Sequence, residues 1–296
     1  MDNTKVIHIY SSGGVGDTLI VALKIDKLKN YEKQQGNTTM FYWDHAERHE
    51  CHRNAISEIM KKTVGEDYFK CEIQPEMGSN PEHYIKEKCK SMNGTYLDTK
   101  IMGITSPYLD FKIGEDFIIS WEEKLVPHIV VNMLAGRTYN TRREVNVKVV
   151  HQLAKEFPKK RVVLLGPEMM EYLDNEFIQY EGRVYNATGH TDTIIDALSF
   201  INGCCLFVGQ DGVLAYYSMM LRKPTIVHYH MPSLIQHYFN QNWAYHSIAL
   251  FGGGNVLESL DLNNNEIIAL LDIAKKYERR PEVKILCKAG NKYEQY

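Results

Sequence analysis

The 296-residue sequence lacks the features of a membrane or secreted protein. No apolar run approaches the about 18 residues that a membrane-spanning helix needs. The amino-terminal residues do not combine a basic segment with an apolar core, so we expect no secretory signal. The net charge of −3 lacks the basic excess of a general nucleic-acid binder. We therefore expect a cytoplasmic protein without a membrane span.

Paired redox and metal motifs are also missing. The six cysteines never form C-x-x-C, and we expect them to be reduced. No D-x-D pair, which would hold a metal-bound nucleotide sugar, occurs in the chain. The one cluster of metal-like ligands is His45, His49, Cys51 and His52. A helix predicted over 44–62 would put the first two histidines on one face, but the second pair does not continue it, so a metal site stays the less favoured alternative.

Short apolar runs alternate with amphipathic segments, above all after Pro127. The predicted strands are 5–10, 38–43, 128–133, 161–166, 184–185, 204–209 and 224–229. The predicted helices are 18–30, 44–62, 147–157, 168–179, 193–201, 213–221 and 264–280. This alternation is typical of doubly wound parallel sheets, and the length suits two domains. We predict two α/β domains facing across a cleft, 1–124 and 125–296, with the last helix packing back on the first domain.

The stretch Ser11–Leu19, S-S-G-G-V-G-D-T-L, joins the first predicted strand to the first predicted helix. Gly14 and Gly16 allow another group to approach the backbone closely, and a helix amino terminus favours an anion. The dinucleotide motif G-x-G-x-x-G does not fit, because its last position is Leu19. Asp17 then has two interpretations, an N-cap of the helix or a catalytic base on a rigid turn.

A second strand-to-helix turn, Gly209-Gln210-Asp211-Gly212, precedes Val213. Its backbone N–H groups and the following helix dipole suit a diphosphate. The Asp211 carboxylate suits a ribose or sugar hydroxyl, and the alternative is an ordinary turn with an N-cap aspartate.

Charged residues follow two other predicted strands. Arg137, Arg142 and Arg143 come after the strand 128–133, where arginine suits phosphate, although a solvated surface loop would show the same pattern. Glu168 follows the strand 161–166, a position where acidic residues bind ribose hydroxyls. We predict that these four residues bind a nucleotide.

Three separated pieces together resemble glycosyltransferase family nine, the heptosyltransferase-like enzymes with the GT-B fold. Residues 11–19 resemble the family's opening strand, loop and helix. Residues 162–168 resemble its V-L-L-G-x-E segment, and residues 208–224 its D-[ST]-G-x-x-H-x-A-x-A-L-x-x-P segment. The chain departs from the last pattern, because Gly212 replaces serine or threonine and Tyr216 replaces histidine.

The resemblance implies an inverting, metal-independent glycosyltransferase that needs no cofactor besides its co-substrate, a nucleotide-diphosphate sugar. It implies that Asp17 is the catalytic base, that Glu168 contacts the donor nucleoside, and that the 209–213 segment wraps the donor diphosphate. The expected acceptor is a saccharide or a glycolipid. One alternative is a phage-type enzyme acting on a modified base in DNA, with the basic run from Lys275 to Lys292 meeting phosphates; another is a non-catalytic nucleotide-sugar-binding protein.

Overall fold

The chain divides into two compact units, Met1–Lys112 and Ile113–Tyr296. In this computed structural model no helix among the described residues is long and apolar enough to cross a membrane. The residues that the structure describes are 4–12, 15–16, 18–19, 32–46, 53–59, 69–74, 95–98, 128–135, 143–180, 182–191, 194–231, 246–252 and 254–276.

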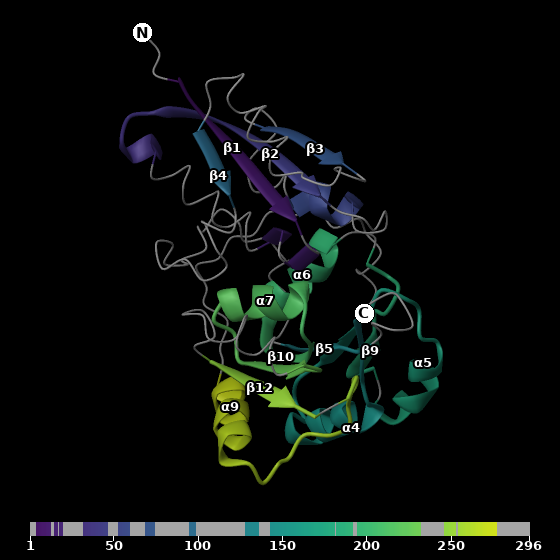
Figure 1. The fold of residues 1–296 in the computed structure, drawn as a ribbon. Coiled ribbons are helices and arrows are strands. Elements are labelled where there is room, and N and C mark those ends of the chain that lie inside the picture. The colour runs from purple at the N-terminus through teal and green to yellow at the C-terminus, as the bar shows by residue number, and fades with distance from the viewer. Residues whose placement is uncertain are drawn as a thin grey trace. The chain divides into compact units, whose positions relative to one another are not determined.

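The first unit contains a four-stranded sheet in the order β3-β2-β1-β4, and every strand pair in it is parallel (Figure 1). Its strands are β1 (Thr4–Ser12), β2 (Thr38–Ala46), β3 (Phe69–Gln74) and β4 (Thr95–Asp98). After β1 the described residues 15–16 and 18–19 are helical, and Leu19 is fully buried. The strand-to-helix transition predicted at this place is therefore confirmed.

The second unit is built on a six-stranded sheet in the order β12-β11-β10-β5-β8-β9, again with every pair parallel. Its strands are β5 (His128–Asn132), β8 (Val162–Leu165), β9 (Val184–Asn186), β10 (Cys204–Gln210), β11 (Thr225–Tyr229) and β12 (Ser247–Phe251). All residues of β5, β8, β10 and β11 are buried, as expected for parallel strands covered on both faces. The predicted doubly wound α/β arrangement of this half is confirmed.

Helices lie between these strands in the sequence and cover the sheet (Figure 1). They are α4 (Val147–Glu156), α5 (Tyr172–Glu176), the 3₁₀ turn η3 (Ile178–Tyr180), α6 (Ile194–Gly203), α7 (Val213–Met220) and α9 (Asn265–Lys276). Asn146 caps α4, because its side chain accepts a hydrogen bond of 3.0 Å from the Lys148 N–H. Ile267 and Leu271 of α9 are buried in the same core as Val149 and Leu153 of α4. The buried face of α9 thus belongs to the core of the second unit.

A small three-stranded sheet, ordered β13-β7-β6, adjoins the large one in the second unit. Its strands are β6 (Leu134–Ala135), β7 (Arg143–Val145) and β13 (Val256–Leu257). The Glu144 N–H donates to the Asn255 carbonyl, and the Val145 N–H donates to the Met133 carbonyl. The first bond joins β7 to the residue that precedes β13, and the second joins β7 to the residue that directly follows β5.

Two predicted helices differ from the structure. The helix predicted over 44–62 is wrong at its start, because β2 continues through Ala46 while paired with strands on both sides, and only 53–59 is described as helical. The helix predicted over 168–179 is wrong for its first turn, because α5 begins only at Tyr172. Met170, which precedes α5, is instead hydrogen-bonded to Asn186 at the end of β9 and to Thr188 after it.

Candidate functional site

The carboxyl ends of β10 and β11 and the short strand β7 bring polar side chains together in the second unit. In open α/β sheets ligands bind outside the carboxyl ends of the strands. Gln210 ends β10, Asp211 and Gly212 form the turn, and Val213 begins α7. Gly212 has a φ of 152°, a value that favours glycine. It is also the N-cap of α7 and makes no side-chain cap bond, so no side chain of the cap residue competes for the first N–H groups of the helix.

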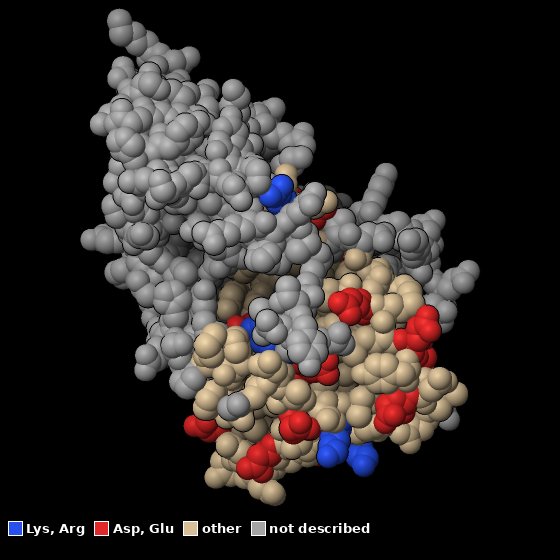
Figure 2. Space-filling view, turned by 45° about the vertical axis from the view of Figure 1, so that its right-hand side comes forward, with Lys and Arg blue, Asp and Glu red and all other residues tan. Residues whose placement is uncertain are grey.

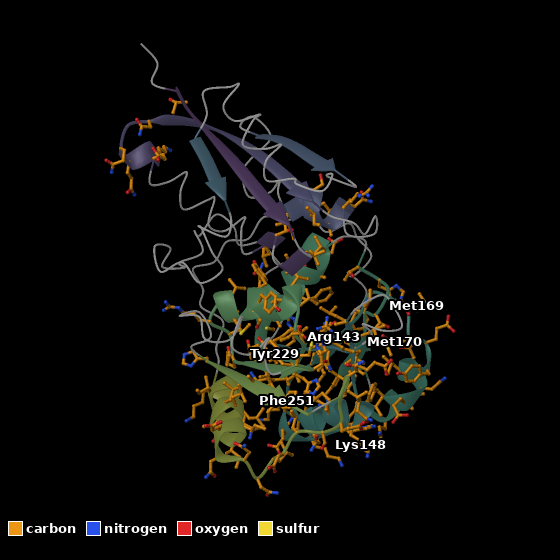
Figure 3. The ribbon with its side chains drawn as sticks, viewed as in Figure 1. Arg143, Lys148, Met169, Met170, Tyr229 and Phe251 are labelled. Atoms are coloured by element: carbon orange, nitrogen blue, oxygen red, sulfur yellow. The ribbon has the colours of Figure 1, made fainter. Side chains whose placement is uncertain are left out.

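Asp211 does not cap α7, and the N-cap interpretation of this residue is therefore wrong. Its carboxylate instead forms a salt bridge with Arg143 of β7, 68 residues away in the chain. Figure 3 labels Arg143 within the second unit. The Arg143 side chain is 16% exposed and that of Asp211 7%. The Nδ1 atom of His230 lies 3.5 Å from the same carboxylate oxygen.

The salt bridge holds the Arg143 guanidinium beside the amino terminus of α7. The Arg143 Nε is buried and has no hydrogen-bond partner among the described residues. A guanidinium presents several donors in a fixed plane, so one edge can bind Asp211 while others remain for a ligand oxygen. Guanidinium and free helix N–H groups both favour anions, so this part of the unit suits a phosphate.

Glu168 lies on an exposed, non-helical loop that follows β8. The loop is fixed by Thr188, whose Oγ1 accepts a hydrogen bond of 3.0 Å from the Met170 N–H. Asn186 donates from Nδ2 to the Met170 carbonyl at 3.1 Å and accepts the Thr188 hydroxyl at 2.6 Å. The carboxyl ends of β8 and β9 are thereby tied together around Glu168, although it does not start a helix as predicted.

Gly189 allows the loop that contains Met169 to lie close to the segment after β9. We expect Gly189→Ala to destabilise the protein by about 3 kcal/mol. Its φ is 71°, which costs a non-glycine residue roughly 1–3 kcal/mol. A Cβ would also lie 2.5 Å from the Met169 backbone nitrogen, a clash with main chain that cannot move freely. Urea unfolding measures the effect.

Gly182→Ala is the matched control. Gly182 has a similar φ of 76°, but a Cβ there meets nothing within 4 Å. Gly182→Ala should therefore lower the free energy of unfolding only by the cost of its positive φ. Gly189→Ala should lower it clearly more. Equal losses would mean that the contact between residues 169 and 189 does not constrain the loop.

Several predicted site residues lie outside the described residues. They are Gly14, Asp17, Arg137, Arg142, His49, Cys51 and His52. Gly16 is described as helical and half-buried. His45 lies in β2, where it is paired with Ser11 and Ile73. The prediction that His45 and His49 share one face of a helix is therefore wrong, because His45 is not helical.

Gln210 and His228 are two buried residues next to Asp211, and the sequence does not predict the hydrogen bond between them. Gln210 is fully buried, and its Oε1 lies 3.0 Å from the His228 Nδ1. His228 is also buried, and burial lowers the pKa of its imidazole, an effect that the nearby Asp211 carboxylate opposes. The sequence does carry a signal, because His228 and His230 stand at alternate positions at the end of a predicted strand and thus on one face.

Cys204 and Cys205 are free and buried in β10. Burial raises the pKa of the Cys204 thiol to about 12 and also raises that of Cys205. Because the thiolate is the reactive form, neither residue is suited to act as a nucleophile.

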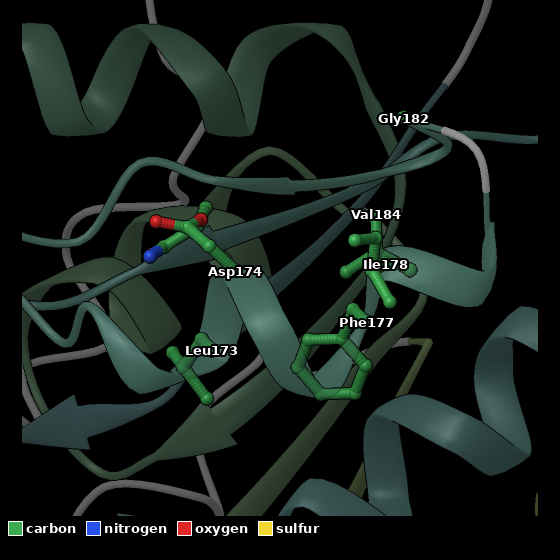
Figure 4. Close-up of a pocket in the computed structure, with 7 residues that line it drawn as sticks. Leu173, Asp174, Phe177, Ile178, Gly182 and Val184 are labelled. Carbon is green, nitrogen blue, oxygen red and sulfur yellow. The ribbon is translucent and has the colours of Figure 1, made fainter.

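A hollow of about 320 Å³ lies at the edge strand β9 (Figure 4). It is lined by Leu173, Asp174, Phe177, Ile178, Gly182, Val184 and Asn186. None of these residues belongs to the predicted nucleotide site. Among the described residues, no group of three or more His, Cys, Asp or Glu side chains is placed to hold a metal ion.

Similarity to known proteins is found in the structure and not in the sequence. No family model and no curated protein matches the sequence. The fold is similar to that of the glycosyl transferase family 9 protein from Veillonella parvula DSM 2008, with 11% identity and a TM-score of 0.50 over 85% of this chain and 87% of that one.

Two Escherichia coli structures are also similar. Heptosyltransferase WaaC with ADP shares 12% identity and a TM-score of 0.56, over 91% of this chain and 99% of the other. ADP-heptose lps heptosyltransferase II shares 15% identity and a TM-score of 0.51, over 90% and 98%. These similarities confirm, at the level of fold, the predicted resemblance to the GT-B enzymes of glycosyltransferase family nine.

Proposed function

We propose that the protein is an inverting, metal-independent glycosyltransferase that uses a nucleotide-diphosphate sugar. The observation that carries the proposal is the Arg143 guanidinium, held by Asp211 beside the amino terminus of α7. A diphosphate leaving group needs such fixed positive charge, because its negative charge grows as the sugar departs. The fold supports the proposal, since one of the similar structures is a heptosyltransferase with ADP.

The reaction has one displacement step. The acceptor hydroxyl oxygen attacks the anomeric carbon, the bond from that carbon to the diphosphate oxygen breaks, and the nucleoside diphosphate leaves with the electron pair. Asp17 takes the proton of the attacking hydroxyl as general base. Arg143 and the first N–H groups of α7 stabilise the leaving diphosphate, helped by Arg142 and Arg137, and Glu168 binds the ribose.

Departures from the family pattern bear on the donor. The Asp211 carboxylate already binds Arg143, so a sugar hydroxyl would have to share it. Gly212 carries no hydroxyl where serine or threonine would stand. We therefore propose a nucleotide-diphosphate sugar as the donor class and a saccharide or glycolipid as the acceptor, in line with the similar structure described as an lps heptosyltransferase.

The DNA alternative has less support. Lys275, the first residue of the basic carboxyl-terminal run, lies 3.0 Å from a Glu156 oxygen and 3.5 Å from an Asp272 oxygen, so its charge is already balanced. On the face in Figure 2, acidic side chains are spread over the described surface among the few basic ones. A DNA-binding surface would instead gather lysine and arginine.

We expect release of nucleoside diphosphate from a nucleotide sugar, in the presence of acceptor saccharides, to continue after treatment with EDTA. Positive charge from arginine and a helix amino terminus would replace the divalent cation that other enzymes use. The assay compares untreated protein, EDTA-treated protein and treated protein with Mn²⁺ or Mg²⁺ restored. Complete loss that either metal restores would contradict metal independence and direct attention back to His49, Cys51 and His52.

A further inference from the structure

Polar groups at the carboxyl ends of β11 and β10 form two adjacent rows that lead to β7. One row contains His228, Gln210 and the backbone carbonyl of Glu144. The other contains His230, Asp211 and the side chain of Arg143. Gln210, the last residue of β10, and Asp211, which follows it, therefore contact Glu144 and Arg143, two consecutive residues of β7.

The first row has a defined hydrogen-bond direction. The Glu144 carbonyl can only accept, so the Gln210 amide nitrogen must face it, as the structure has it. The Gln210 Oε1 then faces His228, 3.0 Å from its Nδ1, and the imidazole must donate from that nitrogen. Gln210 is 0% and His228 1% exposed, so this bond has no competition from solvent.

The second row depends on the first. β7 has three residues, and its partners β6 and β13 have two each, so few backbone bonds hold it. The link from Gln210 to Glu144 fixes the strand at the residue next to Arg143. A shift of the strand would move the guanidinium away from Asp211 and from the amino terminus of α7.

We propose that His228 and Gln210 are positioning residues, which hold β7 so that Arg143 faces the donor diphosphate. This inference rests on the proposed function for the link to the diphosphate, but the hold on β7 can be measured without any nucleotide. Burial lowers the pKa of the His228 imidazole, which favours its neutral form, and the bond to Gln210 places the proton of that form on Nδ1.

Two pairs of variants test the proposal. His228→Asn places an amide N–H near the position of Nδ1 and keeps the donor, whereas His228→Leu removes it. Gly252→Ala displaces the imidazole without removing a polar group, because a Cβ there lies 3.0 Å from the His228 Nε2. Gly254→Ala is its control, since a Cβ at that position meets nothing within 4 Å.

The first readout is hydrogen exchange of a peptide covering residues 143–146 in the full chain without ligand. We expect faster exchange in His228→Leu and Gly252→Ala, and wild-type exchange in His228→Asn and Gly254→Ala. Unchanged exchange in both the His228→Leu and the Gly252→Ala variants would overturn the proposal, whether or not the protein binds nucleotides.

The second readout compares affinity for a nucleoside diphosphate with affinity for its parent nucleoside, using whichever of ADP, UDP, GDP and CDP binds the wild type. We expect His228→Leu and Gly252→Ala to weaken diphosphate binding about tenfold, the effect of one misplaced charged hydrogen bond, and to leave nucleoside binding unchanged. Equal weakening of both ligands would overturn the link to Arg143. A wild type that binds none of the four would refute the proposed function, while the exchange result would still decide the hold on β7.

Discussion

Replacing Asp17 by asparagine should lower sugar transfer by about 10²-fold or more, while the affinity for the nucleotide sugar stays unchanged. Asparagine has nearly the same shape as aspartate and caps helices about as well, so it preserves a structural role. It cannot take a proton from the acceptor hydroxyl at neutral pH. Initial rates of transfer and the dissociation constant of the donor, measured on the same preparations, separate the two roles.

The melting temperature is the control for this substitution. Thr18 and Leu19, which follow Asp17, are fully buried, so a general disturbance of this segment would lower the melting temperature. We expect it to stay within a few degrees of the wild type. An asparagine variant with full transfer activity would remove Asp17 from the role of base and leave only a role in folding.

Replacing both Arg142 and Arg143 by alanine should weaken binding of a nucleoside diphosphate by about 10- to 100-fold and leave binding of the nucleoside nearly unchanged. Hydrogen bonds to charged groups contribute about 1.5–3 kcal/mol each, which corresponds to this range. We expect most of the effect to come from Arg143, because its guanidinium forms a salt bridge with Asp211 directly after β10. Calorimetric titration with both ligands measures the difference.

The alanine substitution has a side effect that needs its own control. Asp211 has a side-chain exposure of only 7%, so loss of Arg143 leaves a buried carboxylate without its main partner and lowers stability. Adding Asp211→Asn to Arg143→Ala removes that charge and should restore part of the stability but none of the diphosphate affinity. Equal loss of diphosphate and nucleoside binding would exclude these arginines from contact with phosphate.

The sheet of the second unit could be predicted because its strands are buried on both faces. Such strands form continuous apolar runs, as in 128–132 and 204–210, and the helices between them are amphipathic. The strands β6, β7 and β13 could not be predicted in this way, since two or three residues show no periodicity. The start of α5 was misplaced because the loop at Met170 is fixed by Thr188, a contact that no local pattern contains.

The sequence predicts where the residues of the candidate site lie in the fold, but not which side chains contact one another. The strand-to-helix turn at 210–213 and an exposed Glu168 after β8 follow from the order of strands, since strand ends in a parallel sheet share one edge. The bond from Arg143 to Asp211 joins residues 68 positions apart, and the partners of Gln210 come from two other strands. These contacts depend on the register of β11 beside β10 and on the position of β7, which the sequence pattern leaves open.

The most direct test of the account is the melting temperature of the protein, in EDTA, with ADP-, UDP-, GDP- and CDP-sugars. A ligand that binds only the folded state at about 100 times its dissociation constant stabilises it by about 2.7 kcal/mol. The account predicts that one nucleotide series raises the melting temperature by several degrees and that the corresponding nucleoside without phosphates has a much smaller effect. No increase with any of the four series would contradict the assignment as a nucleotide-sugar-dependent glycosyltransferase.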